Sequence, residues 1–457
     1  MKITTDYLTF ERDKGAQRAN YGIPSSAYLH IPFCRRRCYY CDFPVFVVGD
    51  RKNGDNSGTI VQYVEVLCQE IQKTPNKGSA LNTVFFGGGT PSLLSVKQLT
   101  TILETLDSQF GIAAEAEISI EIDPGTFTLE QLRGYVAAGV NRVSLGSQAF
   151  QDELLQACGR SHSVADIFAS VEIIRAAGIV NFSLDLISGL PHQTASEWEA
   201  SLRAAVAISP THLSSYDLII EPVTAFGRYF QAGEQPLPAD ETAAQMYRLA
   251  REILTDSGYE HYEISNYARP GYQCRHNRVY WENRPYYGLG MGAASYVDGV
   301  RWTRPRKTQE YYEWVRSISP IDSQDDADST IKQNLSLSAN EVLLETLMLG
   351  LRLAEGLSLS ELADKFGQKT VEKIWQSLQP YSRQGWVEIV AADGAIPDAI
   401  ASLHTTLNQG ELLPLSGNLR LSDPEGFLFS NTILATLFNK LEENITLLRS
   451  GTQGQSA

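Results

Sequence analysis

Three cysteines, Cys34, Cys38 and Cys41, lie within the eight residues of "CRRRCYYC". A zinc site normally takes four Cys or His ligands in paired spacings, and a disulfide would leave one thiol over. A four-iron cluster usually takes four cysteines, so three thiolates would leave one iron open to a small molecule. We favour such a cluster over zinc because the motif directly follows the first predicted strand. The three arginines between the first two cysteines would then supply positive charge beside it.

Glycines follow a second predicted strand in the same way. The sequence "GGGT" (87–90) ends the β-rich run 81–87. Glycine lets the backbone approach a ligand closely, and successive amides can bind a carboxylate. A tight turn is the alternative interpretation of the same residues. Because the glycines and the cysteines both follow strands, we favour a binding role.

Carboxylates stand in or at the ends of two further runs. Glu121 and Asp123 close one run, and Asp185 lies near the end of another. Glu121 can accept two ribose hydroxyls or can be a structural acid at a strand end. Asp185 needs a partner because a buried unpaired charge is costly, and Arg160 or a ligand are the candidates. Tyr28 can pack on a cluster or ligand, or belong to the core.

Regular alternation of strand and helix patterns is what positions these residues. Helical spacing marks 60–73, 95–110 and 163–178, and "TASE" (194–197) is a capping box before a helix at 197–208. Six such alternations predict parallel strands in a barrel or part of one, with its chemistry at the strands' carboxyl ends. The six β-rich runs are 25–33, 81–87, 117–123, 141–148, 181–189 and 212–221.

Composition limits the remaining choices. The chain has 457 residues, 43% of them hydrophobic, with a formal charge of −15. No apolar run reaches the roughly 18 residues that span a bilayer, and the start lacks the apolar stretch of a secretory signal. The acidic balance argues against a nucleic-acid partner. Six cysteines, half of them in one cluster, form no disulfide framework and indicate a reducing cytoplasm.

The chain divides into five predicted parts. We expect an α/β fold with a partial (β/α)6 TIM-like barrel and a mainly helical C-terminal domain. In that domain 357–367 resembles a helix–turn–helix segment, which we interpret as packing rather than DNA binding. The parts are an N-terminal segment (1–23), the core with its extension (24–316), an acidic linker (317–337), the helical domain (338–448) and a disordered tail (449–457).

The C-x₃-C-x₂-C spacing resembles the radical S-adenosylmethionine (SAM) superfamily. There, the amino and carboxylate groups of SAM chelate the open iron of a [4Fe–4S] cluster, and reductive cleavage gives a 5′-deoxyadenosyl radical. The resemblance implies that SAM supplies the missing fourth ligand. Such a cofactor carries the radical chemistry, while the protein supplies position and electrostatics.

Further segments resemble the branch that contains oxygen-independent coproporphyrinogen III oxidase. They are "AYLHIPFCRRRCYYCDF", "GGGTPS", "EIDPGT", "SLGSQAF", "GRSHS" and "SLDLISGLP". The likeness runs from about residue 24 to 440 and weakens after 316, and residues 389–415 look like an insertion in the C-terminal domain. It implies that SAM is bound by Tyr28, Tyr40, Gly88, Gly89, Thr90, Glu121, Gln148, Arg160 and Asp185.

Two departures separate the chain from the oxidase. Phe43 stands where the oxidase carries a further cysteine, and only 33 residues precede Cys34, fewer than in the oxidase. Both count against porphyrinogen oxidation. "CDF" and "CRHNRVYW" (274–281) are instead similar to the sister group of heme chaperones, HemW, whose HN-x-x-YW motif is intact here. That group binds heme and passes it to client proteins.

The resemblance therefore implies a heme site that includes 262–281. Imidazole and thiolate both ligate heme iron, so we expect His276 as the axial ligand, with Cys274 as its rival and His261 as a more remote candidate. Tyr280 and Trp281 would offer flat apolar surface to the macrocycle. In the alternative interpretation these aromatics belong to the core, and His276 is a hydrogen-bonded residue in the barrel's last turn.

The sequence thus predicts a heme chaperone on a radical SAM scaffold, with a [4Fe–4S] cluster, SAM and heme as cofactors. The alternatives are an oxygen-independent coproporphyrinogen III dehydrogenase and a radical SAM enzyme with another substrate. The core suggests SAM cleavage, whereas porphyrinogen oxidase activity is not expected. The expected partners are heme and heme-accepting clients, with peripheral membrane association through those clients, a homodimer, and no nucleic acid.

Overall fold

An open barrel forms the larger part of the molecule. The computed structural model describes residues 22–318, 338–391 and 416–452. One nine-stranded sheet runs in the order β11-β1-β4-β5-β6-β7-β8-β10-β9. Its six central strands are mutually parallel and confirm the six predicted runs. They are β1 (Ser26–Ile31), β4 (Leu81–Gly88), β5 (Ile112–Ile122), β6 (Arg142–Gln148), β7 (Phe182–Ser188) and β8 (His212–Asp217).

Three short strands that the sequence did not predict extend the sheet at both edges. β11 (Tyr287–Leu289) adds in parallel to β1. At the other edge β10 (Asn266–Ala268) pairs antiparallel with both β8 and β9 (Glu260–Glu263). The partial barrel is confirmed, and these additions come from the Tyr- and Trp-rich region after the sixth strand.

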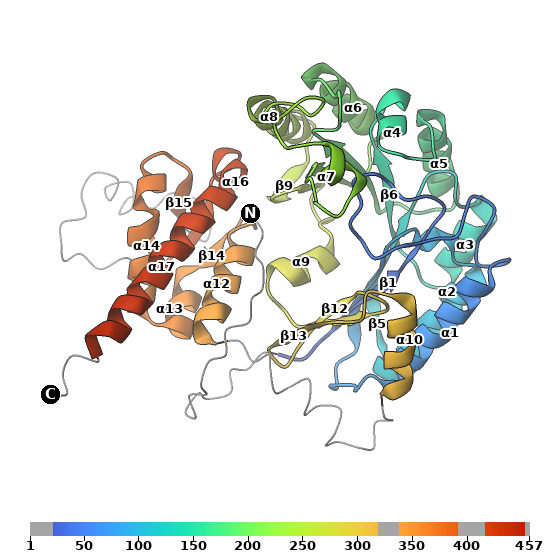
Figure 1. Cartoon of the computed structure of the whole chain (residues 1–457), viewed down its shortest axis with the longest axis horizontal. Coiled ribbons are helices and arrows are strands. Elements are labelled where there is room, and N and C mark those ends of the chain that lie inside the picture. Colours follow the sequence, from blue (N-terminus) through green and yellow to red (C-terminus); the bar gives the residue numbers. More distant parts are fainter. Residues whose placement is uncertain (1–21, 319–337, 392–415, 453–457) are drawn as a thin grey trace.

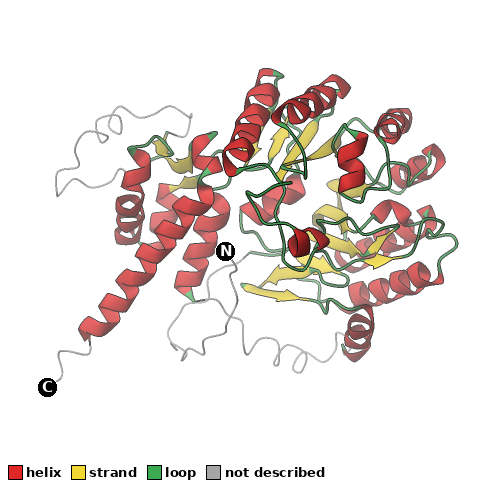
Figure 2. Cartoon of the chain, turned by 45° about the horizontal axis from the view of Figure 1, so that its top comes forward, coloured by secondary structure: helices red, strands yellow, loops and turns green. Residues whose placement is uncertain are grey.

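Helices cover the outside of the barrel (Figure 2). The predicted helices are confirmed as α1 (Gly58–Lys73), α2 (Val96–Phe110), α5 (Val164–Ala176) and α6 (Ala195–Ile208). Thr194 and Glu197 form the predicted capping box, which satisfies two free amides at the start of α6. The other elements of this part are β2 (Phe33–Cys34), β3 (Phe46–Val47), η1 (Pro91–Leu93), α3 (Leu129–Ala137), α4 (Asp152–Ala157), α7 (Ala225–Tyr229), α8 (Asp240–Asp256), α9 (Arg275–Trp281), β12 (Ala294–Val297), β13 (Val300–Thr303) and α10 (Thr308–Ser317).

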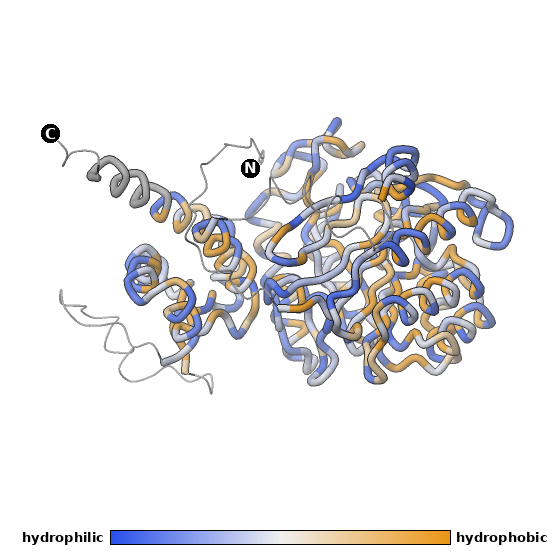
Figure 3. Tube along the Cα trace, turned by 90° about the horizontal axis from the view of Figure 1, so that it is seen from below, coloured by the Kyte–Doolittle hydropathy of each residue, from blue (hydrophilic) through white to orange (hydrophobic). Residues whose placement is uncertain are grey.

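The two faces of the sheet differ in chemistry. Side chains such as Leu29, Phe86 and Ile120 point outward and form one buried core with the helices. Hydrophobic and hydrophilic stretches alternate along the tube of this part of the chain (Figure 3). Inward-facing positions instead carry buried polar groups, which include Ser119, Arg142, Ser144, Ser183 and His212. A closed TIM barrel fills its interior with branched apolar side chains, so this polar interior indicates a binding function.

A smaller C-terminal domain has its own apolar core. It is mainly helical, as predicted, but it also contains a three-stranded sheet in the order β14-β16-β15. The segment 357–367, which resembled a helix–turn–helix, corresponds to β14 and α13, and the buried side chains of α13 belong to this core. The elements are α12 (Ala339–Gly350), β14 (Leu357–Ser358), α13 (Leu359–Phe366), α14 (Gln368–Ser382), β15 (Val387–Val390), β16 (Asn418–Leu421), α16 (Glu425–Leu428) and α17 (Ser430–Thr452).

Ion pairs and backbone bonds join this domain to the barrel. Arg248 pairs with Glu425 at 2.6 Å, and Arg301 pairs with Glu345 at 3.1 Å. The amide of Ile264 donates to the carbonyl of Arg352 at 3.1 Å. Helix α9 contacts both β4 and α12, so it lies between the barrel and the C-terminal domain (Figure 1).

Several predicted segments lie largely outside the described residues. These are the N-terminal segment, the acidic linker, and most of the inserted stretch 389–415, of which the first two residues complete β15. The predicted tail at 449–457 begins too early, because α17 continues to Thr452. No helix in the described ranges is long and apolar enough to cross a bilayer.

Candidate functional site

The cysteine loop is held at the carboxyl end of β1. Its base is closed by the short β2–β3 pair, in which Cys34 lies opposite Val47. Its tip is fixed by two backbone bonds: the amide of Tyr39 donates to the carbonyl of Cys158 at 3.0 Å, and the amide of Phe226 donates to the carbonyl of Tyr39 at 2.9 Å. The loop is therefore anchored to α4 and α7, which places its thiols over the strand ends.

The three thiols are free and partly buried. Burial raises the pKa of Cys34 to about 12, and the charge of Asp123 adds to that effect. Burial also raises the pKa of Cys41. Both thiols therefore keep their protons at neutral pH until a metal displaces them, which is the usual coupling between metal binding and ligand deprotonation.

The positive charge beside the thiols comes mainly from an arginine outside the loop. Nη1 of Arg160 donates to Sγ of Cys38 at 3.4 Å. Of the three arginines predicted for this role, Arg36 forms an exposed ion pair with Asp50 at 2.8 Å, and Arg35 donates to the Gly125 carbonyl. Arg37 braces loop carbonyls and lowers the pKa of Cys41 as a minor effect. Arg35 and Arg36 nevertheless line the recess beside Cys38, so their charge near a cluster stays a prediction.

The donor set fits a cluster better than a single metal ion. Within the described ranges, no group of three Cys, His, Asp or Glu side chains could hold one metal ion. A [4Fe–4S] cluster is larger and takes one thiolate per iron, so its ligands do not need to converge on one point. Three thiols on one anchored loop, beside a buried arginine, meet that requirement.

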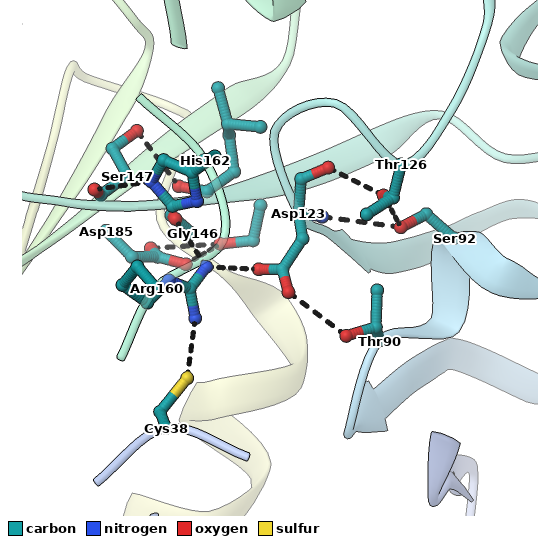
Figure 4. A network of polar contacts seen from close by, with 12 residues as sticks. Cys38, Thr90, Ser92, Asp123, Thr126, Gly146, Ser147, Arg160, His162 and Asp185 are labelled. Atoms are coloured by element: carbon teal, nitrogen blue, oxygen red, sulfur yellow. Dashed lines mark hydrogen bonds and ion pairs between the residues drawn. The ribbon is translucent and has the colours of Figure 1, made fainter. Parts of the chain in front are cut away.

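A polar network joins the thiols to the ends of β4, β5 and β6 (Figure 4). Arg160 forms an ion pair with Asp123 at 2.5 Å and donates to the Gly146 carbonyl at 2.9 Å. Asp123 also accepts a hydrogen bond from Oγ1 of Thr90 at 3.0 Å. The predicted pairing of Arg160 with Asp185 is therefore wrong, because Asp123 lies closer to the guanidinium.

The glycines have a packing role that the sequence did not specify. Gly88 has a φ of +112°, and an added Cβ would meet the His30 ring at 2.5 Å. The amides of Gly88, Gly89 and Thr90 already donate to Glu121, Ile31 and Phe33, respectively. Each of these amides already has a partner within the chain, and the binding of a ligand carboxylate by them stays a prediction. Close approach of neighbouring strands also requires the glycine at position 88.

A cavity of about 430 Å³ occupies the inside of the barrel. Seven residues that the sequence singled out line it: Tyr28, Phe43, Gly88, Glu121, Asp185, His276 and Tyr280. Residues that sequence reasoning missed also line it, among them His30, Arg142, Ser144, Ser214, Tyr216 and Arg306. Three predicted residues, Cys38, Thr90 and Arg160, line a smaller recess beside the thiols.

Two carboxyl groups in the cavity wall have raised pKa values. Burial raises the pKa of Glu121 to about 8, and the nearby charge of Asp185 contributes. Glu121 therefore holds its proton near neutral pH. Burial also raises the pKa of Asp185, which accepts hydrogen bonds from Ser144 at 2.7 Å and from Ser183 at 3.1 Å. These serines are the partners that the buried acid requires.

His276 forms part of the cavity wall at the start of α9. Its Nδ1 is 2.7 Å from Oγ1 of Thr83, and its Nε2 is 2.9 Å from the Tyr280 hydroxyl. The side chain is 1% exposed and stacks on Phe85. Burial lowers its pKa to about 3, so the ring is neutral. These contacts fit the alternative interpretation of His276 as a hydrogen-bonded residue, although the side chain also lines the cavity.

Three other residues considered for heme lie away from the cavity, whereas Tyr280 lines it. Cys274 is fully buried, with Sγ 3.7 Å from a carboxylate oxygen of Glu117, and burial raises its pKa to about 12. Trp281 lies under the Arg352 guanidinium of the C-terminal domain. His261, a more remote candidate, bonds to Asp423 at 2.9 Å. None of the three lines the cavity.

Two further predicted SAM residues flank the cluster loop. Tyr40 packs against Phe226 and lies close enough to Arg160 for the guanidinium to oppose the rise in the Tyr40 pKa that burial causes. Gln148 ends β6 with a φ of +65°. Such a conformation is uncommon for a residue other than glycine, and it often occurs where a side chain is aimed at a functional site.

Comparison with protein families gives two matches along the chain. Residues 28–205 match the radical SAM superfamily, and residues 337–391 match the HemN C-terminal domain. The first match covers five of the six central strands, from β1 to β7, and ends within α6, before β8. The second covers the C-terminal domain as far as β15.

Similar proteins include heme chaperones that match over most of the chain. The "Heme chaperone HemW" of Synechocystis sp. is 47% identical over 428 residues, covering 93% of this chain and 98% of the relative. The protein of the same name from Bacillus subtilis is 34% identical, covering 85% and 96%. The structure of coproporphyrinogen III oxidase (HemN) from Escherichia coli has a TM-score of 0.70 at 22% identity, covering 92% and 91%. That structure shows the fold.

Proposed function

The chain belongs to the HemW family of heme chaperones within the radical SAM superfamily, and on this premise we propose that it binds heme and passes it to client proteins. The observation that carries the proposal is the 47% identity to a heme chaperone over nearly the whole of both chains. The polar cavity inside the barrel supports it, because a small-molecule site needs such a concave space. A reducing cytoplasm and a homodimer stay predictions.

The radical SAM core gives the chain a second binding function. The cofactors of the superfamily are a [4Fe–4S] cluster and SAM. We infer that Cys34, Cys38 and Cys41 hold the cluster, which when bound supplies an iron with one open position. The residues that we propose for SAM are those at the strand ends and beside the loop: Tyr28, Tyr40, Gly88, Gly89, Thr90, Glu121, Gln148, Arg160 and Asp185. The ion pair between Arg160 and Asp123 would hold the cysteine loop in place beside the bound SAM.

The mouth of the cavity supports a chaperone over an oxidase. Phe43, which is 52% exposed, lines the cavity at the position where the oxidase branch carries a further cysteine. An exposed phenyl ring can pack against a flat macrocycle, but it offers no thiol for radical or ligand chemistry. Tyr216, also exposed, lines the same opening.

Replacing His276 tests the proposed axial ligand of heme. We expect His276→Ala to weaken heme binding roughly tenfold and to shift the Soret band, because a ring nitrogen that can reach iron is lost. For ligation, the Tyr280 hydroxyl must first leave Nε2. Tyr280→Phe should therefore leave the band position unchanged and strengthen binding.

Cys274→Ala is the matched variant for that experiment. It removes the rival ligand, which the barrel wall separates from the cavity. We expect the Soret band of heme-loaded Cys274→Ala to match that of the unmodified chain. If the His276→Ala spectrum is unchanged while the Cys274→Ala spectrum shifts, the assignment of His276 is wrong.

One sample can test the proposed function against the oxidase alternative. The cluster is reconstituted without oxygen, and the sample is divided between a heme titration and incubation with coproporphyrinogen III, SAM and a reductant. We expect saturable heme binding and no protoporphyrinogen. Protoporphyrinogen formed in repeated turnovers would favour the dehydrogenase, and absence of heme binding would reject the chaperone proposal.

A further inference from the structure

One buried arginine in the cavity wall has no described role. Arg142, at the start of β6, is 2% exposed and lines the cavity. Its Nε has no hydrogen-bond partner, and no ion pair of the described residues within 4.0 Å includes its guanidinium. A buried guanidinium without such a partner is costly, so a protein that keeps one usually has a ligand for it.

A second unpartnered polar group lies beside Arg142. Ser119 on β5 is directly opposite Arg142 in the sheet register. It is 1% exposed, and its hydroxyl also has no partner. Ser119 faces inward because residues two apart on a strand share a face, and Glu121 lines the cavity. The same register row continues through Phe85 to Tyr28, both of which line the cavity.

The neighbouring carboxylates are already engaged by other groups. Glu117 accepts from the backbone amides of Arg275 and His276 at 3.1 and 3.0 Å. Asp185 accepts from the Ser144 and Ser183 hydroxyls. Both acids act on Arg142 through space, yet neither forms an ion pair with it. The guanidinium fork is thus available to a third carboxylate, a group that it binds in a bidentate manner.

We propose that Arg142 and Ser119 form a carboxylate subsite in the wall of the cavity and that it binds a propionate of the heme. This inference rests on the proposed function and assigns it a recognition residue. The methionine carboxylate of SAM has the same chemistry and is the competing source. Heme is the choice because Arg142 lines the same cavity as His276 and Phe43, whereas Cys38 lines a separate recess. Residues that we propose for SAM, such as Glu121 and Asp185, line this cavity too, so the SAM measurement below decides between the two sources.

The test compares Arg142→Met with the unmodified chain, using heme and heme dimethyl ester, whose propionates are blocked. We expect the unmodified chain to bind heme roughly ten- to hundredfold more tightly than the ester. Arg142→Met should bind both ligands alike, at the level of the ester. Its melting temperature without ligand should be equal or higher, because the substitution removes a buried unpaired charge.

Three controls make the outcome specific. Arg306→Met removes an exposed arginine of the cavity wall that donates to the Asp42 carbonyl at 3.1 Å, and it should keep the preference for heme over the ester. Arg142→Lys, which keeps the charge, should restore part of that preference. SAM affinity of the reconstituted Arg142→Met protein should be unchanged.

Each contrary outcome has a distinct meaning. Equal binding of heme and ester by the unmodified chain would overturn the subsite while leaving the proposed function intact. Loss of SAM affinity with heme affinity unchanged would assign the carboxylate to SAM and overturn the heme assignment. Absence of binding by both heme and ester would reject the proposed function itself.

Discussion

Replacing Cys34, Cys38 and Cys41 together with alanine is expected to abolish incorporation of iron and sulfide. The three thiols are the cluster ligands that the anchored loop offers, and burial keeps Cys34 and Cys41 protonated without metal. Each thiolate holds one iron, so the triple variant retains no protein ligand. Iron and sulfide analysis after anaerobic reconstitution, together with the absorption of the cluster, measures the effect.

Cys68→Ala is the matched control for the triple variant. Cys68 lies on α1 and is also a partly buried free thiol, but it is remote from the loop in sequence. It should take up the full cluster. A triple variant that keeps a complete four-iron cluster would contradict the ligand assignment, and a Cys68→Ala protein without a cluster would indicate a general loss of folding.

Glu121→Gln is expected to make the protein more stable at pH 8. In the folded chain the pKa of Glu121 is about 8, against about 4.5 for a free glutamate. Between these values the folded chain binds a proton that the unfolded chain has lost, so the free energy of unfolding falls as pH rises. This loss of unfolding free energy is complete above pH 8. It amounts to roughly 3 kcal/mol, a figure reduced from the full pKa difference because Glu121 lines the cavity and is partly screened.

Denaturant unfolding at pH 4.5, 6 and 8 checks this expectation. Glutamine keeps a neutral oxygen for the Gly88 amide, so the two proteins should match at pH 4.5 and differ most at pH 8. The difference in unfolding free energy between the two proteins reports on Glu121 alone, because both proteins contain every other carboxyl group. Equal slopes of stability against pH would show that Glu121 is ionised in the folded chain.

The sequence predicted the barrel because its signals are local. Alternation along β5 and capping boxes such as Thr194 with Glu197 depend on residues close together in the chain. The edge strands were missed because β9, β10 and β11 have three or four residues each, too few to show a period. Only pairing with β8 and β1 makes them strands.

The sequence predicted which residues form the site better than it predicted which residues they contact. Placement after β1 and β4 brought Cys38 and Thr90 to one recess, as expected from parallel topology, and the loop after α4 adds Arg160. The sequence could not show that Arg160 pairs with Asp123, because the partner lies 37 residues away and depends on exact loop geometry. Arg142 was missed because only the folded barrel shows that it is buried and that its Nε has no hydrogen-bond partner. The sequence did show that Arg142 and Ser144 are two residues apart on one strand and so share a face.

The central claim is that heme passes from this chain to a client by contact. Heme-loaded protein is mixed with increasing concentrations of apo heme proteins from the same cell, and with apomyoglobin as a passive acceptor, while the Soret band is followed by stopped flow. We predict that for at least one cellular acceptor the transfer rate rises with acceptor concentration and exceeds the constant rate of release to apomyoglobin. A single rate that is the same for every acceptor and independent of its concentration would mean passive release, and would contradict a chaperone function.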